Sequence, residues 1–287
     1  MAIDPFPQIS QQYGFLFFVG SPLGRSQYDA LQIELVQRAS HGITADFSYN
    51  LARFRTNTTN NNFAETWNTD YILQDLSDVS GYDANYIKPY NQHIFKGYIQ
   101  WALPFGKGRR FLSSSGKLVD AVLGNWSLGS VLYLSTGKPM RISSSNYYPG
   151  WNAAVYANVA SGADFSRRFD GKQLDLNNPA NPSNQYFDPS AFSDPAFGSF
   201  GNSGPYVVGL NDFGTYTQDL AIIKEFRMGE RFRLQLRGEF YDVFNRHYFS
   251  SPYASGIETN IASPYFGQVT SVQPTSRIGH VGARIQW

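Results

Sequence analysis

The chain closes with the stretch Arg277-Ile-Gly-His-Val-Gly-Ala-Arg-Ile-Gln-Trp287, in which the two parities differ in character. One parity carries Gly279, Val281, Ala283, Ile285 and Trp287, and the other carries Ile278, His280, Gly282, Arg284 and Gln286. Successive side chains of a strand point to opposite faces, so this period of two predicts a strand with an apolar medium on one side and a polar medium on the other. A soluble sheet and a membrane barrel both satisfy the pattern.

Strand length separates the two possibilities. The same alternation recurs over residues 28–37, 43–53, 92–103, 126–135, 216–226 and 232–241. A strand of about ten residues, tilted by about 45°, rises roughly 23 Å, close to the ~25 Å apolar band of an outer-membrane barrel. Strands of soluble sheets average nearer five or six residues. The lengths therefore favour an all-β, antiparallel transmembrane barrel of about seven strands, with residues 15–19 as a short candidate for an eighth.

The alternation also assigns side chains to the two faces. In 232–241 the arginines Arg233 and Arg237 alternate with apolar residues. An arginine facing lipid near the midplane costs about 2–4 kcal/mol, so both are expected to face the lumen. The lumen-facing residues predicted in this way are Lys96, Arg233, Arg237, Glu239 and Arg284. They either line a translocation path or pair with one another and with a plug. Lys224 falls on the apolar parity and is expected to snorkel to water at the strand end.

Loop lengths and aromatic residues indicate an orientation. The connections at 38–42 and 227–231 are short, the one at 105–125 is of medium length, and those at about 56–91, 137–214 and 245–276 are long. If the last strand ends in the periplasm, the shorter turns lie there and the long loops lie outside, as in outer-membrane barrels. Trp101, Trp126, Phe232 and Trp287 then form a periplasmic aromatic girdle, and Tyr49, Phe95 and Phe240 lie nearer the outer surface.

Composition argues against several other classes of function. Charged residues are 16% of the chain, against a usual fraction of roughly 25%, and the net charge of +1 gives no sign of nucleic-acid binding. There is no cysteine, and His41, His93, His247 and His280 show no metal-ligand spacing. The sequence has no nucleophile elbow, and 106–110 lacks the spacing of a phosphate loop. We expect no enzymatic activity, no cofactor and no metal.

The long segment 143–205 is the best candidate for contact with a ligand, because loops on a rigid barrel carry recognition and aromatic rings stack on sugars and other flat groups. The candidate contacts are Tyr147, Tyr148, Trp151, Tyr186 and Phe187. Oxygen ligands for Ca²⁺ are also available in the same segment, at Asp170, Asp175, Asn177 and Asn178. Their spacing does not match an EF-hand, so ordinary turn chemistry is the favoured interpretation.

Several motifs in combination resemble a known family. They are Leu103-Pro-Phe-Gly-Lys-Gly-Arg-Arg-Phe111, Leu134-Ser-Thr-Gly-Lys-Pro139, Tyr186-Phe-Asp-Pro-Ser-Ala-Phe192, Phe200-Gly-Asn-Ser-Gly204, Lys224-Glu-Phe-Arg-Met-Gly-Glu-Arg-Phe232 and Phe240-Tyr-Asp-Val-Phe-Asn245. Together they resemble the C-terminal barrel region of TonB-dependent outer-membrane receptors of the Oar-like group, which carry a carboxypeptidase-regulatory-like domain. The resemblance implies a barrel of 22 strands, an N-terminal plug, a segment that contacts TonB, and location in the outer membrane.

On this interpretation residues 1–287 form one partial barrel. The partners implied are outer-membrane lipid, the rest of the receptor barrel and its plug, and TonB through the plug. The terminal strand, with Val281, Ile285 and Trp287, resembles the signal that the barrel assembly machinery reads. The cost of strand edges also favours a partial barrel. A sheet of about seven strands leaves two unpaired edges, and in hydrocarbon each unpaired backbone group costs several kcal/mol. Two alternatives stay open: a self-contained small outer-membrane barrel acting as an adhesin or enzyme, and a soluble β-sandwich that binds carbohydrate.

Overall fold

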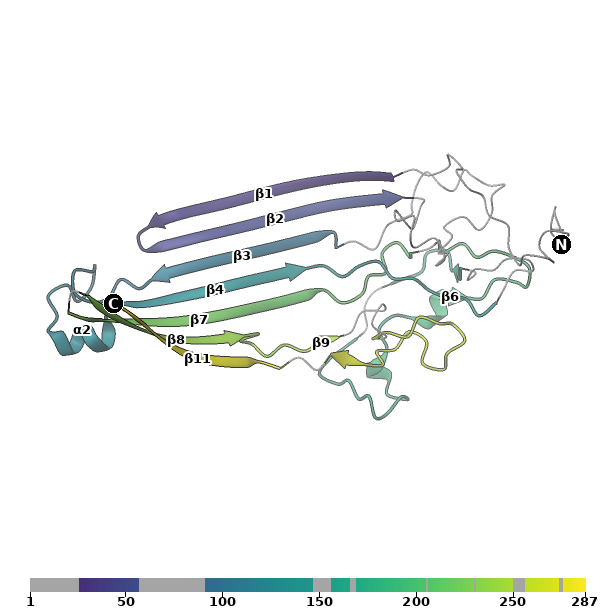
Figure 1. Cartoon of the computed structure of the whole chain (residues 1–287). Coiled ribbons are helices and arrows are strands. Elements are labelled where there is room, and N and C mark those ends of the chain that lie inside the picture. The colour runs from purple at the N-terminus through teal and green to yellow at the C-terminus, as the bar shows by residue number, and fades with distance from the viewer. Residues whose placement is uncertain are drawn as a thin grey trace, which may run out of the picture.

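The dominant element of the computed structural model is one antiparallel sheet of seven strands in the order β1-β2-β3-β4-β7-β8-β11 (Figure 1). The structure describes residues 26–56, 91–146, 156–165, 169–204, 206–229, 231–249, 256–273 and 276–287. The strands of the sheet are β1 (Ser26–Ser40), β2 (Ile43–Thr56), β3 (His93–Ala102), β4 (Trp126–Ser135), β7 (Thr215–Met228), β8 (Phe232–Tyr241) and β11 (Ile278–Gln286). Each strand of the sheet pairs with the next one along the chain, so the sheet is an up-and-down meander.

The connections are sorted by length between the two ends of the sheet. One end, called here the turn end, carries the β1–β2 turn at His41 and Gly42, the β7–β8 turn, helix α2 (Lys117–Leu123) and the C-terminus (Figure 1). The opposite end, the loop end, carries the described parts of the β4–β7 and β8–β11 connections, together with the end of β2 and the start of β3. This is the arrangement expected from the sequence. Among the described residues, no helix is long and apolar enough to cross a membrane.

Strand register keeps two chemically different faces continuous across the sheet. Residues directly opposite one another on paired strands share a face. One row of the apolar face runs through Ile43, Trp101, Leu128, Ile222, Gly238 and Val281. The adjacent row of the polar face runs through Thr44, Gln100, Gly129, Ala221, Glu239 and His280. The two-faced character inferred from each strand separately is thus a property of the whole sheet.

The predicted strand bounds agree well with the structure. The segments 126–135 and 232–241 have the expected limits, 92–103 is shorter by one residue at each end, and β1, β2 and β7 extend beyond the predicted limits. The candidate eighth strand at 15–19 lies outside the described residues. The structure adds α2 to the connection 103–125, where no helix was expected. Within the described ranges β1 and β11 are the edges of the sheet, which does not close on itself.

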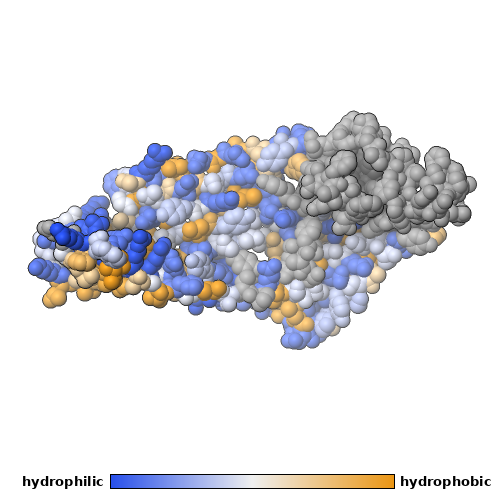
Figure 2. All heavy atoms as spheres, in the orientation of Figure 1, coloured by the Kyte–Doolittle hydropathy of each residue, from blue (hydrophilic) through white to orange (hydrophobic). Residues whose placement is uncertain are grey.

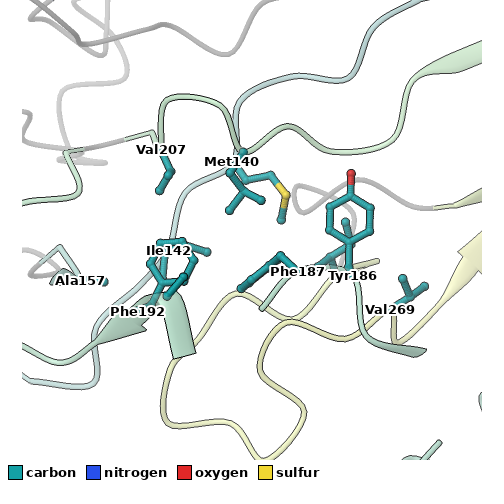
Figure 3. Close-up of a cluster of buried hydrophobic side chains, with 11 residues drawn as sticks. Met140, Ile142, Ala157, Tyr186, Phe187, Phe192, Val207 and Val269 are labelled. Atoms are coloured by element: carbon teal, nitrogen blue, oxygen red, sulfur yellow. The ribbon is translucent and has the colours of Figure 1, made fainter. Parts of the chain in front are cut away.

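The long connections at the loop end fold together around a hydrophobic core of their own (Figure 3). We call the described parts of 136–214 and 242–277 the loop domain. Its regular elements are short: β5 (Asn158–Val159), the 3-10 turns η3 (Pro182–Asn184) and η4 (Pro189–Ala191), β6 (Phe192–Ser193), β9 (Tyr248–Phe249) and β10 (Val272–Gln273). Its buried apolar residues are Met140, Ile142, Ala157, Tyr186, Phe187, Ala191, Phe192, Val207, Leu210, Ile257 and Val269.

Backbone hydrogen bonds join the two long connections into one unit. The amide of Tyr186 donates to the carbonyl of Gly267 at 2.8 Å, and the amide of Val269 donates to the carbonyl of Asn184 at 2.8 Å. The amide of Ser143 donates to the carbonyl of Thr259 at 3.0 Å. Each bond joins residues of the β4–β7 connection to residues of the β8–β11 connection. The loop domain is therefore held by long-range pairing as well as by its apolar core.

Candidate functional site: two sheet faces and a folded loop domain

The apolar face of the sheet is exposed, although it is built of large hydrophobic side chains. Leu35 is 65% exposed, Val281 91% and Trp287 89%. All four aromatic residues expected at the turn end, Trp101, Trp126, Phe232 and Trp287, lie on this face by register or parity. An exposed apolar surface of this extent, bordered by aromatic residues at its end, has the character of a lipid-contacting surface. Figure 2 shows one side of the molecule, with hydrophobic and hydrophilic side chains alternating over the strands.

A short polar cluster interrupts the apolar face where β4 meets β7. The hydroxyl of Tyr216 donates to Oε1 of Gln218 at 2.8 Å, and Nε2 of Gln218 donates to Oγ of Ser130 at 3.2 Å. Oγ of Ser130 donates in turn to the carbonyl of Asp219 at 2.9 Å. Each of these polar side chains thus has a hydrogen-bond partner, which lowers the free-energy cost of placing it on an apolar surface.

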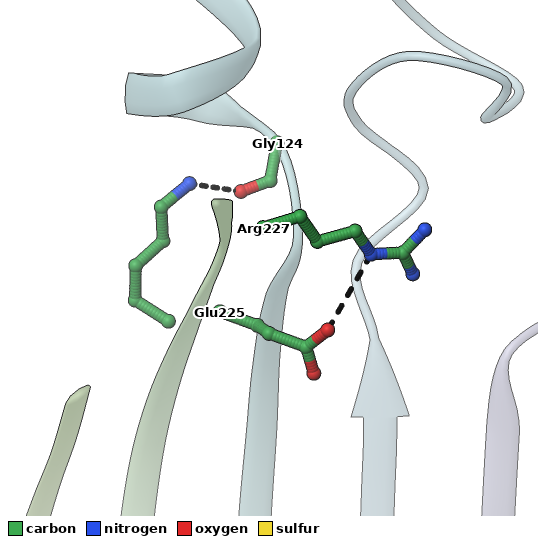
Figure 4. A network of polar contacts seen from close by, with 4 residues as sticks. Gly124, Glu225 and Arg227 are labelled. Atoms are coloured by element: carbon green, nitrogen blue, oxygen red, sulfur yellow. Dashed lines mark hydrogen bonds and ion pairs between the residues drawn. The ribbon is translucent and has the colours of Figure 1, made fainter. Parts of the chain in front are cut away.

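Lys224 is the second exception on the apolar face, and the expectation that its ammonium group snorkels to water is wrong. Lys224 is only 3% exposed, and its Nζ donates to the carbonyl of Gly124, just beyond α2, as the dashed bond to Gly124 in Figure 4 shows. A second carbonyl, that of Asp120, lies 3.5 Å from Nζ. Nζ also lies 5.4 Å from the Trp126 ring centroid and 5.0 Å from that of Phe226. Helix α2 therefore covers the charge.

The polar face carries all five residues predicted to face a lumen. Lys96 lies opposite Ser48 and Tyr133, while Arg233, Arg237 and Glu239 of β8 share their face with Arg284 of β11. The structure pairs Arg237 with Glu239, with 2.8 Å between Nε and Oε1. Glu225 and Arg227 form a second ion pair on the same face, at 3.5 Å (Figure 4). The face thus carries charges of both signs, and some of them pair with neighbours on the same strand.

A shallow hollow of about 150 Å³ opens at the turn end of the polar face. Its polar lining includes Gln100, Arg109, Glu225, Arg227 and Gln235. The hollow is open to solvent and small compared with the ~300–1,000 Å³ of a typical ligand pocket. It is a local feature of the charged face rather than a closed binding site.

The structure changes the interpretation of the candidate ligand contacts. Tyr186 is 2% exposed and Phe187 is 0% exposed, and both belong to the core of the loop domain (Figure 3). The Tyr186 hydroxyl donates to the carbonyl of Asn211 at 2.5 Å. These two rings are therefore packing residues and are not available to a ligand at the surface. The other three candidates, Tyr147, Tyr148 and Trp151, lie outside the described residues.

The motif 186–192 is built to order the loop domain. Asp188 precedes η4, and its Oδ1 accepts from the amide of Ser190 at 2.9 Å, with Pro189 at the first position of the turn. This cap directs Tyr186 and Phe187 on one side, and Phe192 on the other, into the core. Phe187 and Phe192 meet edge to face, with their ring centroids 5.5 Å apart. The motif thus has a folding role.

The motif 200–204 stabilises the same domain through hydrogen bonds to residues 157–159. Oδ1 of Asn202 accepts from the amide of Val159 in β5 at 2.7 Å, and the amide of Ser203 donates to the carbonyl of Ala157 at 3.0 Å. A Cβ atom at Gly201 would collide with the carbonyl oxygens of Tyr156 and Ala157, so a glycine is required for this close approach.

The acidic segment 170–178 forms turns, as favoured from the sequence. Oδ1 of Asp170 accepts from the amide of Lys172, and Oδ1 of Asp175 accepts from the amide of Asn177, each at 3.0 Å. The buried side chain of Asn184 donates to the carbonyls of Asp175 and Asn178 at 2.9 and 3.1 Å. Across the described residues, no cluster of three or more His, Asp or Glu has the arrangement of a metal site.

A family model described as an outer membrane beta barrel domain matches residues 3–280. The match covers nearly the whole chain. The chain belongs to this family of outer-membrane β-barrel domains. Neither the comparison with curated proteins nor the comparison with solved structures finds a match.

Membership in this family explains the main features of the structure. The protein lies in the outer membrane, and the exposed apolar face with its aromatic end is the surface that suits contact with lipid. Proteins of this architecture place short turns in the periplasm and long loops outside the cell, so the turn end is periplasmic and the loop domain is extracellular. The interpretation as a soluble β-sandwich is excluded.

Proposed function

We propose that this barrel domain is the C-terminal part of a TonB-dependent receptor and takes part in solute binding and uptake across the outer membrane. The observation that carries the proposal is that, within the part of the chain that the structure describes, β1 and β11 are open sheet edges on a sheet whose two faces already have the character of a barrel wall. A wall of this kind needs further strands on both edges to become a receptor barrel.

The energetic reason lies in the edges themselves. Strand β1 has 15 residues and β11 has nine, and about half of the backbone groups of each point away from their single partner strand. Each unsatisfied backbone group in hydrocarbon costs several kcal/mol, which for two edges sums to tens of kcal/mol. That exceeds the net stability of 5–15 kcal/mol typical of a folded domain. This cost supports the proposal that both edges pair with additional strands in the membrane.

The polar face supports a role as the wall of a lumen that contains a plug. Lys96, Arg233, Arg237, Glu239 and Arg284 all point to this face. Four of the five are basic, and Glu239 and the nearby Glu225 add negative charge to the same face. Charges of both signs suit ion pairs with a polar plug domain better than they suit selection of one charged solute. In this arrangement the plug is the partner that TonB acts on, and the wall residues guide and seal it.

The loop domain supplies the surface that a solute meets first. Its own apolar core holds it rigid at the mouth of the barrel, which lowers the entropic cost of binding. The candidate contacts that remain after the burial of Tyr186 and Phe187 are Tyr147, Tyr148 and Trp151. No covalent step is part of the proposed function, so the protein acts as a transporter and not as an enzyme.

Two further partners belong to the proposal. TonB acts through the plug region, and the barrel assembly machinery recognises the terminal strand with Val281, Ile285 and Trp287. Val281 and Ile285 lie on the apolar parity of β11, which Trp287 continues just beyond the strand, and the three side chains are 91%, 56% and 89% exposed. An exposed apolar strand edge of this kind is available for pairing with an insertase before the barrel closes.

The test uses the intact outer-membrane protein that contains this chain, purified in detergent. Electron cryomicroscopy counts the strands of its barrel, and a binding assay with the periplasmic domain of TonB is run beside a control in which the plug is deleted. The proposal expects a barrel of about 22 strands. It also expects binding of TonB that is lost when the plug is deleted. A barrel closed by this chain alone, with no response to TonB, would identify a small self-contained barrel and overturn the proposal.

A further inference from the structure

We propose that residues 104–125, in the connection between β3 and β4, are a membrane-interface anchor that inserts helix α2 into the periplasmic leaflet of the outer membrane and binds its anionic headgroups. We call residues 104–125 the interface segment. The proposal concerns the attachment of the domain to lipid and does not depend on the transport function.

Helix α2 is amphipathic, with its apolar side facing outward. Leu118 and Val122 are four residues apart, as are Val119 and Leu123, so these four side chains share one side of the helix. They are 85%, 65%, 42% and 49% exposed, respectively. The opposite side carries Asp120, whose Oδ1 accepts from the amide of Lys107 at 2.5 Å. The helix therefore turns its polar side to its own segment and presents its apolar side outward.

Contacts to the sheet fix the side on which α2 lies. Nε1 of Trp126 donates to the carbonyl of Val122 at 2.8 Å, and Nζ of Lys224 donates to the carbonyl of Gly124. Trp126 and Lys224 lie opposite one another on the apolar face. Helix α2 is therefore outside the barrel wall at its periplasmic end, where its apolar side continues the lipid-contacting surface of the strands.

The rest of the interface segment has the same character. Phe105, Phe111 and Leu112 are 40%, 48% and 43% exposed, and the rings of Phe105 and Phe111 lie 5.6 Å apart. Figure 2 shows hydrophobic side chains gathered beside hydrophilic ones at the end of the molecule where α2 lies. Seven exposed hydrophobic side chains in one turn are unfavourable in an aqueous periplasm and suit the boundary between headgroups and acyl chains.

Charge favours a phospholipid surface as the occupant. The interface segment contains four basic residues and one acidic residue, Asp120. Arg109 lines the hollow on the polar face, which leaves Lys107, Arg110 and Lys117 for a headgroup layer. The Arg110 guanidinium lies 5.5 Å from the Phe111 ring centroid, so a cation and an aromatic ring meet at the same place. Basic residues next to exposed apolar side chains match a layer of phosphate groups above acyl chains.

The test uses single cysteines, since this chain contains none. Leu118→Cys and Val122→Cys report the outward side of α2, and Ala121→Cys on the other side is the matched control. Each intact variant is labelled with an environment-sensitive fluorophore and reconstituted into vesicles of phosphatidylethanolamine and phosphatidylglycerol. Quenching by a lipid carrying a nitroxide near its headgroup is compared with quenching by aqueous iodide. Protease-resistant, heat-modifiable protein shows that a variant has folded.

The expected result is strong lipid quenching and weak iodide quenching at positions 118 and 122, with the reverse at position 121. Omitting phosphatidylglycerol, or introducing Lys107→Gln together with Arg110→Gln, is expected to reduce lipid quenching at position 122. Iodide quenching at all three positions would place α2 in water. Protection of positions 118 and 122 from both quenchers would show that protein covers them. Lipid quenching that is indifferent to phosphatidylglycerol and to the Gln substitutions would refute headgroup binding. Each of these three outcomes overturns the proposal as stated.

Discussion

Lys224 of β7 and Gly124, just beyond α2, are joined by a hydrogen bond from the lysine ammonium group to the glycine carbonyl. The bond links a strand of the barrel wall to a helix that is 100 residues away in the sequence. It serves two groups at once, because the lysine charge is satisfied on an apolar face and the helix end gains a positive partner for its carbonyls.

Replacing Lys224 by methionine is expected to loosen α2. The carbonyl of Gly124 loses its charged donor, whereas that of Asp120 keeps its bond from the Gly124 amide. An unsatisfied buried acceptor costs about 1–3 kcal/mol. Amide hydrogen exchange in the peptide spanning 117–124 should accelerate by roughly tenfold, the factor that corresponds to about 1.4 kcal/mol. Lys96→Met, on the polar face, is the matched control and should leave this exchange unchanged. Equal exchange in Lys224→Met and the unmodified protein would show that the bond contributes nothing to the helix.

Gly97 occupies a position where a side chain meets an aromatic ring. A Cβ atom there would lie 3.0 Å from Cδ1 of Phe47, whose ring stacks with that of Phe95 at a centroid distance of 6.0 Å. Gly97→Ala is expected to destabilise the domain by about 1–3 kcal/mol through overpacking. Gly129→Ala places its Cβ 3.6 Å from Cβ of Ala221, an ordinary contact, and is expected to be neutral or slightly stabilising. Urea denaturation in detergent measures both variants, and equal midpoints for the two would contradict this account.

The loop domain is expected to unfold independently when its core is opened. Phe187 is fully buried, and its truncation in Phe187→Ala should cost about 3–5 kcal/mol. Limited proteolysis should then cleave within 137–214, while the barrel keeps its heat-modifiable migration on gels. Val208→Ala, at a side chain that is 49% exposed in the same domain, should behave like the unmodified protein. Loss of the barrel together with the loop domain would show that the two are one cooperative unit.

Asp194 makes part of the loop domain sensitive to acid. Burial by itself raises the pKa of its carboxyl group, but hydrogen bonds from Ser144 and Ser145 outweigh this effect and hold the pKa below the usual value of 3.8. The bonds include one from Oγ of Ser144 at 2.6 Å and one from the amide of Ser145 at 2.9 Å. Because the folded-state pKa is lowered, the stabilisation is complete well above pH 3.8 and is lost as the pH falls through the lowered value.

Asp194→Asn should remove this contribution at every pH. Hydrogen exchange around Ser144 and Ser145, taken relative to the intrinsic amide exchange rate at each pH, is expected to become faster in acid in the unmodified protein. In the variant it should already be fast at neutral pH and should depend less on acid. A variant with the same acid profile as the unmodified protein would assign the effect to another group.

The strands and the orientation of the sheet could be predicted from the sequence because alternation is a local property. The apolar and polar parities of 232–241 and 277–287 follow from single strands, and pairing of Leu234 with Ile285 keeps them on one face. Strand length and the sorting of connections by length then indicate a membrane barrel without information on contacts. The family match agrees with this part of the interpretation.

The parts that could not be predicted depend on contacts between distant segments. Helix α2 has only seven residues and no side-chain cap, so its stability comes from Trp126 and Lys224 and not from a local signal. The aromatic residues at 186 and 187 sit in a segment rich in turn residues, which suggested an exposed loop. Their burial depends on backbone pairing of this segment with residues 256–273. Periodicity in the sequence does not predict such pairing between distant segments.

The most direct test of the central claim compares adjacent residues on the two faces of β8 and β11. Single cysteines replace Leu234 and Ile285 on the apolar face, and Gln235 and Arg284 on the polar face, in the intact protein reconstituted into bilayers. Fluorophores at 234 and 285 are expected to be quenched by nitroxide lipids, while cysteines at 235 and 284 are modified by a water-soluble thiol reagent. Free reaction of positions 234 and 285 with the aqueous reagent, or lipid quenching at 235 and 284, would contradict the assignment of the two faces.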